Sequence, residues 1–427
     1  MNKLYKGDFY VKLLEITGGE TLSGTIRISG AKNSAVALIP AAILADSEST
    51  ICNIPEITDI DALCDILDDL GVSVKRSTES VIVDPTNLKN KEIPENLSRK
   101  LRASYYFMGA LLGKYKKVEM CFPGGCSIGA RPIDLHLKGF EALGAKVKVK
   151  GNKYTVEAKK LKGAPIYLDI ASVGATINIM LAAVKAEGKT TIDNAAKEPE
   201  IVNVATFLNS MGAKITGAGT STIKIVGVEH LKGCFHEVIP DRIEAGTYLI
   251  IGALCGKKLK IDNIIPEHLE SLTSKLQEIG ASLEIGPDYI TISKKAGYKG
   301  VRVQTATYPG FPTDLQQPFT TLLTQCKGNS KLEETIYENR FMHVPYLVDM
   351  GADIVIEGDT LKIKGPTKLQ AREVVATDLR AGAALVAAAL TAKGTTKITN
   401  VEHILRGYER IVEKLKAVGA KIKSLEI

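Results

Sequence analysis

The chain has 427 residues, of which 45% are hydrophobic and 24% are charged. Such a chain is long enough for several domains of about 100–200 residues and apolar enough to bury packed cores, which excludes a disordered protein. A net charge of +7, only 5% aromatic residues and no tryptophan disfavour a nucleic-acid binder and favour small anionic ligands.

The sequence also argues against a membrane protein and a secreted protein. No apolar run approaches the ~18 residues that a membrane-spanning helix needs, and the start, MNKLYKGDFY, lacks the apolar core of a signal peptide. The seven cysteines are scattered without a C-x-x-C pair, which disfavours a disulfide framework or a zinc site. We therefore expect a cytoplasmic protein without a metal site.

One pattern of elements recurs six times along the chain, about every 70 residues. Each copy has an apolar stretch, a short strand that ends in Asn or Pro, a more amphipathic helix, and a Gly that precedes a β-hairpin of alternating residues. We expect each Gly to cap its helix, because Gly tolerates left-handed backbone angles. These glycines are Gly71, Gly144, Gly212, Gly280, Gly351 and Gly419.

The apolar stretches are apolar on nearly every face, which indicates helices buried inside a domain. In chain order they are NSAVALIPAAILA (33–45), ASYYFMGALLG (103–113), GATINIMLAAVKA (174–186), AGTYLIIGALCG (245–256), QQPFTTLLTQC (316–326) and AGAALVAAALTA (381–392). We predict an α/β fold of two three-repeat domains, residues 32–240 and residues 1–31 with 241–427, each with inner helices and outer sheets. In a single doubly wound sheet, the alternative, the strands would be the continuous apolar runs.

Charged or small polar residues open these six helices. They are Lys32 and Asn33, Arg102, Ser172 to Gly174, Asp241 and Arg242, Asp314, and Asp378 with Arg380. The free N–H groups and the dipole of a helix N-terminus attract anions, and three parallel helices would bring their ends to one face. Ordinary capping and solvated charges are the alternative, but recurrence at the same repeat position favours an anion site, and two opposed faces could hold a ligand with several phosphates.

A glycine-rich segment, PGGCSIGARP (123–132), contains a cysteine with no apolar neighbours. Its glycines suit a lid that moves over a site, and Arg131 would lower the pKa of the Cys126 thiol, which either raises the fraction of reactive thiolate or tunes the group as a proton donor. His136 follows the segment and could assist binding or be structural. The sequence contains no Ser-His-Asp elbow, zinc-protease motif or P-loop, which disfavours those chemistries.

Ten ordered motifs across nearly the whole chain resemble those of the enolpyruvyl transferases, in particular the branch that uses a UDP-linked amino sugar. They are SGAKNSA (29–35), LRAS (101–104), PGGCSIGARPIDLH (123–136), SVGAT (172–176), NAAKEPEI (194–201), PDRIEAGT (240–247), FPTDLQ (311–316), ENRFMHVP (338–345), DLRAGA (378–383) and RGYERI (406–411). The resemblance implies two inside-out α/β barrel domains, each of three repeats, with the active site in the cleft between them.

The resemblance also implies a reaction. The enolpyruvyl group of phosphoenolpyruvate would move to the 3′-hydroxyl of UDP-N-acetylglucosamine by addition and elimination, releasing phosphate, in the first committed step of peptidoglycan synthesis. No metal or organic cofactor is implied. Cys126 would be the acid near C3 of phosphoenolpyruvate and the target of the epoxide antibiotic fosfomycin, and Asp314 would accept the hydroxyl proton.

The remaining site residues follow from the same resemblance. Lys32, Arg131 and Arg406 would bind the phosphate, Arg102 and Arg380 belong to the anion site, and Asn33 and Asp378 would orient the reactants. The sugar nucleotide would lie along Arg131, Pro132, Asp134, Leu135, Ser172, Val173, Gly174 and Ile336.

One departure and two alternatives remain. Some members of the family have a Lys two residues before the Ser-Val-Gly motif, where this chain has Ile170, which leaves open how the nucleotide phosphates are held. The chain could instead use shikimate 3-phosphate on the same fold, although that relative lacks a counterpart of the PGGC segment. It could also be a catalytically silent, anion-binding copy, against which Cys126, Asp314 and Arg406 argue.

Overall fold

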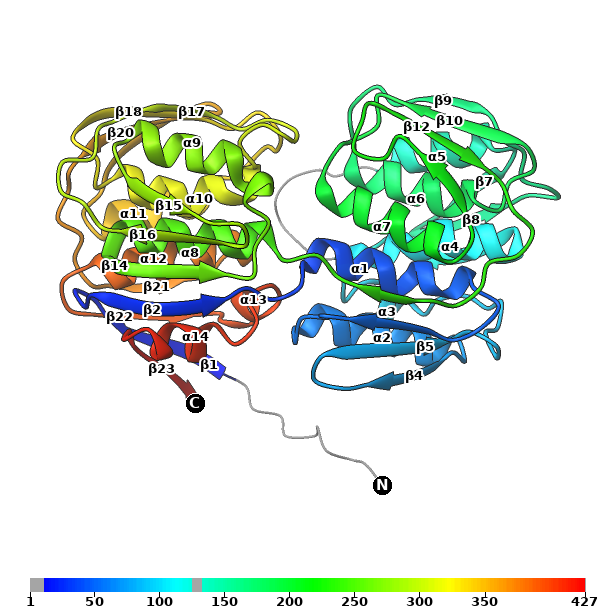
Figure 1. The fold of residues 1–427 in the computed structure, drawn as a ribbon, viewed down its shortest axis with the longest axis horizontal. Coiled ribbons are helices and arrows are strands. Elements are labelled where there is room, and N and C mark those ends of the chain that lie inside the picture. The colour runs from blue at the N-terminus through cyan, green and yellow to red at the C-terminus, as the bar shows by residue number, and fades with distance from the viewer. Residues whose placement is uncertain (1–10, 125–132, 427) are drawn as a thin grey trace. The chain divides into compact units, whose positions relative to one another are not determined.

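A computed structural model describes residues 11–124 and 133–426 (Figure 1). Contacts between residues divide the chain into two compact units. Unit 1 contains Met1–Ile28, Arg242–Ala306 and Gly310–Ile427, and unit 2 contains Ser29–Asp241 and Thr307–Pro309. Each unit has its own hydrophobic core of buried residues.

Apolar helices form the interior of each unit, as Figure 1 shows for α8, α10 and α12 in unit 1. Nearly all residues of these helices are buried, because their apolar side chains cover every face. In the described part of the chain the inner helices are α1 (Lys32–Ala41), α4 (Tyr106–Tyr115) and α6 (Val173–Ala183) in unit 2, and α8 (Arg242–Cys255), α10 (Thr313–Leu323) and α12 (Leu379–Thr391) in unit 1.

A second, more amphipathic helix follows in each repeat and ends at the predicted Gly. These helices are α2 (Thr58–Asp69), α5 (Asp134–Ala142), α7 (Pro199–Ser210), α9 (Glu270–Glu278), α11 (Val344–Asp349) and α14 (Ile411–Ala417). All six glycines have positive φ, from 83° at Gly71 to 107° at Gly212. After each Gly the next N–H donates to a carbonyl five residues back, as from Val72 to Leu67 and from Ala281 to Leu276. The predicted glycine caps are therefore confirmed.

Short elements complete the helical part of the chain. They are α3 (Glu95–Ser98), α13 (Glu402–Leu405) and the 3₁₀ turns Ala42–Leu44, Arg102–Tyr105 and Pro266–Leu269. Arg102, expected to open an inner helix, begins a 3₁₀ turn that continues into α4. None of the helices that the structure describes is both long and apolar enough to cross a membrane.

Sheets cover the inner helices of unit 1. The described strands form three four-stranded sheets in this unit, in the orders β21-β22-β1-β23, β15-β16-β14-β2 and β17-β18-β20-β19. The strands are β1 (Val11–Thr17), β2 (Leu22–Arg27), β14 (Gly256–Asp262), β15 (Ser282–Ile285), β16 (Tyr289–Ser293), β17 (Arg302–Gln304), β18 (Gly328–Glu333), β19 (Asp353–Glu357), β20 (Thr360–Gly365), β21 (Glu373–Val375), β22 (Thr395–Thr399) and β23 (Lys421–Glu426).

Unit 2 repeats this arrangement. Its described sheets have the orders β11-β12-β10-β9, β13-β3-β5-β4 and β6-β8-β7. The strands are β3 (Ser49–Cys52), β4 (Ser73–Arg76), β5 (Ser80–Asp84), β6 (Lys117–Cys121), β7 (Lys146–Lys150), β8 (Lys153–Glu157), β9 (Pro165–Tyr167), β10 (Lys189–Asp193), β11 (Lys214–Thr216), β12 (Thr222–Val226) and β13 (Phe235–Glu237). The predicted α/β class with inner helices and outer sheets is confirmed.

The structure adds a short strand that the sequence analysis did not predict. Among the described residues, this strand precedes the inner helix in three repeats and pairs in parallel with the strand that follows that helix, as β17 pairs with β18 across α10. Two of these strands pair instead with a strand of a different repeat. β2 precedes α1 yet pairs with β14 in unit 1, and β13 precedes α8 yet pairs with β3 in unit 2. The chain therefore passes between the units near residues 28 and 242.

Candidate active site

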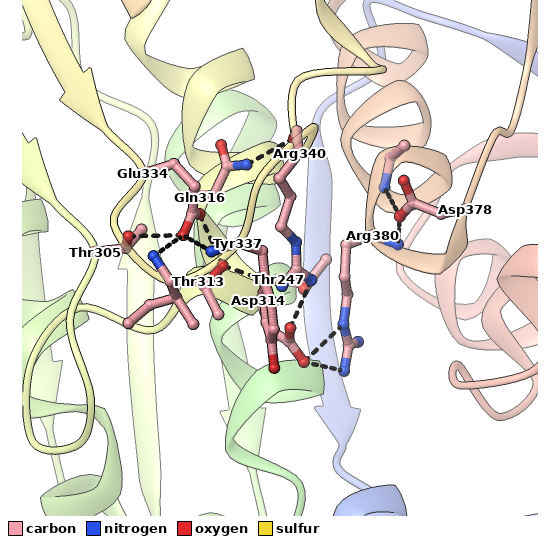
Figure 2. Close-up of polar contacts among 12 residues, drawn as sticks. Thr247, Thr305, Thr313, Asp314, Gln316, Glu334, Tyr337, Arg340, Asp378 and Arg380 are labelled. Carbon is pink, nitrogen blue, oxygen red and sulfur yellow. Dashed lines mark hydrogen bonds and ion pairs between the residues drawn. The ribbon is translucent and has the colours of Figure 1, made fainter. Parts of the chain in front are cut away.

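The predicted site residues that the structure describes fall into three groups, one in unit 1 and two in unit 2. In unit 1 the centre of the group is the carboxylate of Asp314, the second residue of α10. Figure 2 shows two arginines converging on it. Arg340 Nη2 lies 2.6 Å from Asp314 Oδ1, and Arg380 Nη2 lies 3.1 Å from Asp314 Oδ2. Asp314 retains 26% side-chain exposure, so a reactant can still approach a carboxylate that two guanidinium groups hold from both sides.

Local sequence explains how Arg380 reaches this position. Asp378 is the N-cap of α12, and its Oδ1 accepts hydrogen bonds from the backbone N–H groups of Arg380 (2.8 Å) and Ala381 (2.9 Å). An Asp at an N-cap satisfies N–H groups that the helix leaves free. The cap fixes Arg380 in the first turn of α12, from where its buried guanidinium reaches the start of α10. The N-terminal ends of α10 and α12 therefore lie together.

Arg340 contacts the predicted site residue Asp314, and the sequence analysis missed it. It lies in the ENRFMHVP motif, which carried the family resemblance, but no role was assigned to it. Its side chain is buried, its Nη1 donates to Thr313 Oγ1 (3.0 Å), and its guanidinium lies 5.1 Å from the centre of the Tyr337 ring. Buried arginines are rare unless they are paired, so the burial of Arg340 beside Asp314 marks it as a candidate site residue. Only the folded structure reveals this burial.

Arg406 and Ile336 also belong to unit 1. Arg406 is half-buried at the end of α13. Two residues further on, the buried ring of Tyr408 lies 5.4 Å from the Arg380 guanidinium carbon, and its hydroxyl is 2.9 Å from Thr247 Oγ1 of α8. The backbone N–H of Ile336 donates to Glu334 Oε1 (2.8 Å). The Arg406 segment is thus tied to α8 and to the N-terminal end of α12.

In unit 2, Lys32 opens α1 and is held at both its backbone and its side chain. Its N–H donates to Asp241 Oδ2 (3.0 Å), and its Nζ lies 2.6 Å from Asp59 Oδ2 of α2. Asn33 follows it and is half-buried. The ion pair with a buried carboxylate fixes the direction of the Lys32 ammonium.

A second group in unit 2 surrounds His136. Asp134 is exposed and Leu135 half-buried at the start of α5, and Ser172 caps α6 by accepting a hydrogen bond from Ala175 N (3.3 Å). A Cβ on Gly174 would lie 2.8 Å from Tyr105 Oη and 3.1 Å from His136 Cε1, so a larger residue would require these side chains to shift. The structure thus brings Gly174 against His136.

The His136 ring is buried and neutral. Burial, and secondarily the charge of Arg102, lowers the pKa of His136 to about 3. The amide nitrogen of Asn178 lies 2.9 Å from His136 Nδ1 and also donates to Tyr105 O, while Asn178 Oδ1 accepts from Gly109 N. Because this amide nitrogen is a donor, Nδ1 accepts and the ring proton sits on Nε2.

Three predicted residues, Cys126, Arg131 and Pro132, lie outside the described residues. Ile170, two residues before Ser172, has an exposed side chain. No three His, Cys, Asp or Glu side chains gather into a metal-binding cluster within residues 11–124 and 133–426.

Comparisons with known proteins give the family. The profile of the family described as EPSP synthase (3-phosphoshikimate 1-carboxyvinyltransferase) matches residues 16–415. The chain is 56% identical over 409 residues to UDP-N-acetylglucosamine 1-carboxyvinyltransferase 2 of Listeria monocytogenes, covering 96% of this chain and 97% of the relative. A protein of the same name from Bacillus cereus is also 56% identical, over 96% of each chain.

Solved structures have the same fold. The enolpyruvyl transferase NikO from Streptomyces tendae matches with a TM-score of 0.88 and 27% identity, over 96% of this chain and 98% of its own. EPSP synthase from Acinetobacter baumannii matches with a TM-score of 0.75 and 19% identity, over 96% of this chain and 99% of its own, which supports the fold alone. The chain belongs to the EPSP synthase family of enolpyruvyl transferases, together with the UDP-N-acetylglucosamine 1-carboxyvinyltransferases it resembles over nearly its whole length.

Proposed function

We propose that the chain transfers the enolpyruvyl group of phosphoenolpyruvate to the 3′-hydroxyl of UDP-N-acetylglucosamine and releases phosphate, as the name of its 56% identical relatives suggests. The structural observation that carries the proposal is the Asp314 carboxylate, held between Arg340 and Arg380 at the start of an inner helix. An accessible carboxylate with a fixed position suits a group that accepts the proton of the attacking hydroxyl.

The proposed reaction has two steps. Cys126 donates a proton to C3 of phosphoenolpyruvate while the sugar hydroxyl adds to C2 and gives its proton to Asp314. The tetrahedral ketal then loses phosphate, C3 returns a proton to the Cys126 thiolate, and the enol double bond forms again. Each carboxylate oxygen has two lone pairs, so Asp314 can accept this proton while it keeps its arginine contacts.

Cations suit this chemistry because phosphoenolpyruvate and the leaving phosphate are multiply charged. We assign phosphate binding to Lys32, Arg131 and Arg406, with Arg102 in the same anion site. Arg380 donates to Asp314, which favours a role in holding that carboxylate. Preorganised donors at developing charge are worth about 10²–10³ in rate each.

The remaining residues are assigned to orientation and to the sugar nucleotide. Asn33 and Asp378 orient the reactants. Arg131, Pro132, Asp134, Leu135, Ser172, Val173, Gly174 and Ile336 line the nucleotide sugar. We also place the protein in the cytoplasm, which the free thiols of the six described cysteines support.

Phosphate release with different acceptors tests this function. We expect turnover when phosphoenolpyruvate is supplied with UDP-N-acetylglucosamine, with a product heavier by one enolpyruvyl group in mass spectrometry, and none with shikimate 3-phosphate. Turnover with shikimate 3-phosphate alone would refute the assignment. Binding of both proposed substrates without product would identify a silent copy.

A further inference from the structure

Glu334 is a buried carboxylate, 3% exposed, in the segment that follows β18. Within the described part of the chain it has no Lys or Arg partner. Instead it accepts four hydrogen bonds, three at Oε1 and one at Oε2 (Figure 2). The Oε1 donors are Thr305 Oγ1 (2.9 Å), Ile336 N (2.8 Å) and Tyr337 N (3.2 Å), and the Oε2 donor is Thr313 Oγ1 (2.7 Å). Burying a carboxylate is costly, so this complete set of donors indicates a specific task.

The directions of these hydrogen bonds connect Glu334 to Asp314. Thr313 Oγ1 accepts from Arg340 Nη1 at 3.0 Å, and a guanidinium can only donate. The single hydroxyl proton of Thr313 therefore points to Glu334 Oε2, 2.7 Å away. Arg340 in turn places its other terminal nitrogen 2.6 Å from Asp314 Oδ1. The contacts therefore run from Glu334 through Thr313 and Arg340 to Asp314.

The same carboxylate shapes the backbone next to it. Its Oε1 accepts from two consecutive N–H groups, those of Ile336 and Tyr337, which fixes the turn that leads to Arg340. The Tyr337 ring then lies 5.1 Å from the Arg340 guanidinium carbon. One side chain therefore sets both the backbone at Ile336 and the direction of Arg340.

We propose that Glu334 is a positioning residue for the transfer reaction: through Thr313 it holds Arg340 on Asp314, and through its Oε1 it holds the backbone at Ile336 for the sugar nucleotide. This inference rests on the proposed function. It predicts that the two contacts of Glu334 affect different kinetic parameters, because Thr313 leads only to Asp314, whereas Ile336 belongs to the nucleotide site.

Substitutions of two threonines on the same helix test the first contact. Thr313→Val removes the bridging hydroxyl and should lower kcat about tenfold, the equivalent of one charge-assisted hydrogen bond, with KM for UDP-N-acetylglucosamine within about twofold of wild type. Thr313→Ser keeps the hydroxyl and should restore kcat. The matched control is Thr321→Val, because Thr321 is also buried in α10 and its hydroxyl donates to Ala384 O (3.0 Å), away from Asp314. A Thr313→Val kcat equal to that of Thr321→Val would refute the inference.

Glu334→Gln tests the contact of Glu334 with the backbone at Ile336 and, combined with Thr313→Val, the coupling between Glu334 and Thr313. The amide cannot accept four hydrogen bonds, so kcat should fall at least about tenfold and KM for UDP-N-acetylglucosamine should rise several-fold. The double variant Glu334→Gln with Thr313→Val should have the kcat of Glu334→Gln alone, because both act through Arg340. If the two substitutions together lower kcat by the product of their separate effects, Glu334 acts independently of Thr313 and the proposal is overturned.

Crystal structures of Thr313→Val and Thr321→Val separate this inference from the proposed function. We expect Arg340 to leave Asp314 only in Thr313→Val, and an unmoved Arg340 would overturn the inference whatever reaction the protein catalyses. A wild-type protein that releases no phosphate from the two proposed substrates would refute the proposed function instead.

Discussion

At the scale of single residues, the described cysteines share one property: burial raises the pKa of each thiol. The pKa is raised to about 12 at Cys64, Cys255 and Cys326. It is also raised at Cys52, Cys121 and Cys234. The thiolate is the nucleophilic form, so these six cysteines should react slowly near neutral pH.

We therefore predict that Cys126 is the first thiol to be alkylated and that fosfomycin labels it. Brief treatment with iodoacetamide or fosfomycin, followed by peptide mass mapping, should find the label on the peptide that contains Cys126. Cys126→Ser should remove most of the rapid labelling. First modification of Cys64 or Cys234 would contradict this prediction.

The lowered pKa of His136 leads to a second prediction, about the stability of the fold in acid. Its pKa is about 3 in the folded protein, against a usual value near 6.5, so the unfolded chain binds more protons between these two pH values. Stability is therefore unaffected above pH ~6.5 and falls as the pH drops towards 3, by about 2 kcal/mol at pH 5 from this residue. Urea unfolding of wild type and His136→Gln at several pH values measures this. Parallel pH curves for the two proteins would show that His136 does not titrate on unfolding.

Local signals in the sequence predicted part of the site but not its supports. Asp378 and Asp314 stand at helix starts, where an acidic residue has a recognisable capping role, and Arg380 follows its cap by two residues. Arg340 carries no such signal, because its partner Asp314 lies 26 residues away and only the fold joins them. Asp59, which pairs with Lys32 from another helix, escaped prediction for the same reason.

At the scale of elements, the six glycine caps make each repeat turn sharply from its outer helix into a hairpin. Gly280 has φ of +100°, and a Cβ there would meet no atom within 4 Å. Any cost of adding a side chain is therefore backbone strain alone.

We predict that Gly280→Ala lowers the free energy of unfolding by about 1–2 kcal/mol, the cost of left-handed backbone angles for an L-residue. Gly280→Asn should lose less, because Asn adopts these angles more readily. Urea denaturation of both variants measures the difference. Equal losses would show that backbone strain is not the cause.

Whether a segment forms a helix or a strand could be predicted from the sequence where the segment was long enough to show a pattern. The inner helices, with ten or more residues each, were evident from continuous apolar sequence. The strands β9, β13, β17 and β21 have only three residues each and one buried side chain, so no periodicity can identify them. Parallel pairing with a strand elsewhere in the sequence, a long-range contact, creates them.

At the scale of the whole molecule, each unit is compact, but the two units differ in how the chain forms them. Unit 2 is formed almost entirely by the single segment Ser29–Asp241, whereas unit 1 combines both ends of the chain. The repeat count predicted two groups of three, but not that β2 and β13 would each complete a sheet with a strand far away in sequence.

We predict that a fragment of residues 29–241 folds alone, because its hydrophobic core is separate and its sheets use only its own strands. Circular dichroism should show helices and strands, and urea should unfold the fragment cooperatively. The complementary fragment 242–427 lacks β1 and β2 and should not fold. A disordered 29–241 fragment would show that its core depends on unit 1.

The pairing of β1 with β23 has a practical consequence for protein engineering. These strands run antiparallel, and Val11 is the register partner of Glu426, so these two ends of the described part of the chain lie side by side. A short peptide could splice them together, and new extremities could be opened at an exposed hairpin tip such as Gly151, between β7 and β8, without breaking a β-ladder. Circularly permuted genes of this kind would allow a fluorescent reporter to be attached to unit 2, while the polypeptide around Asp314 stays uncut.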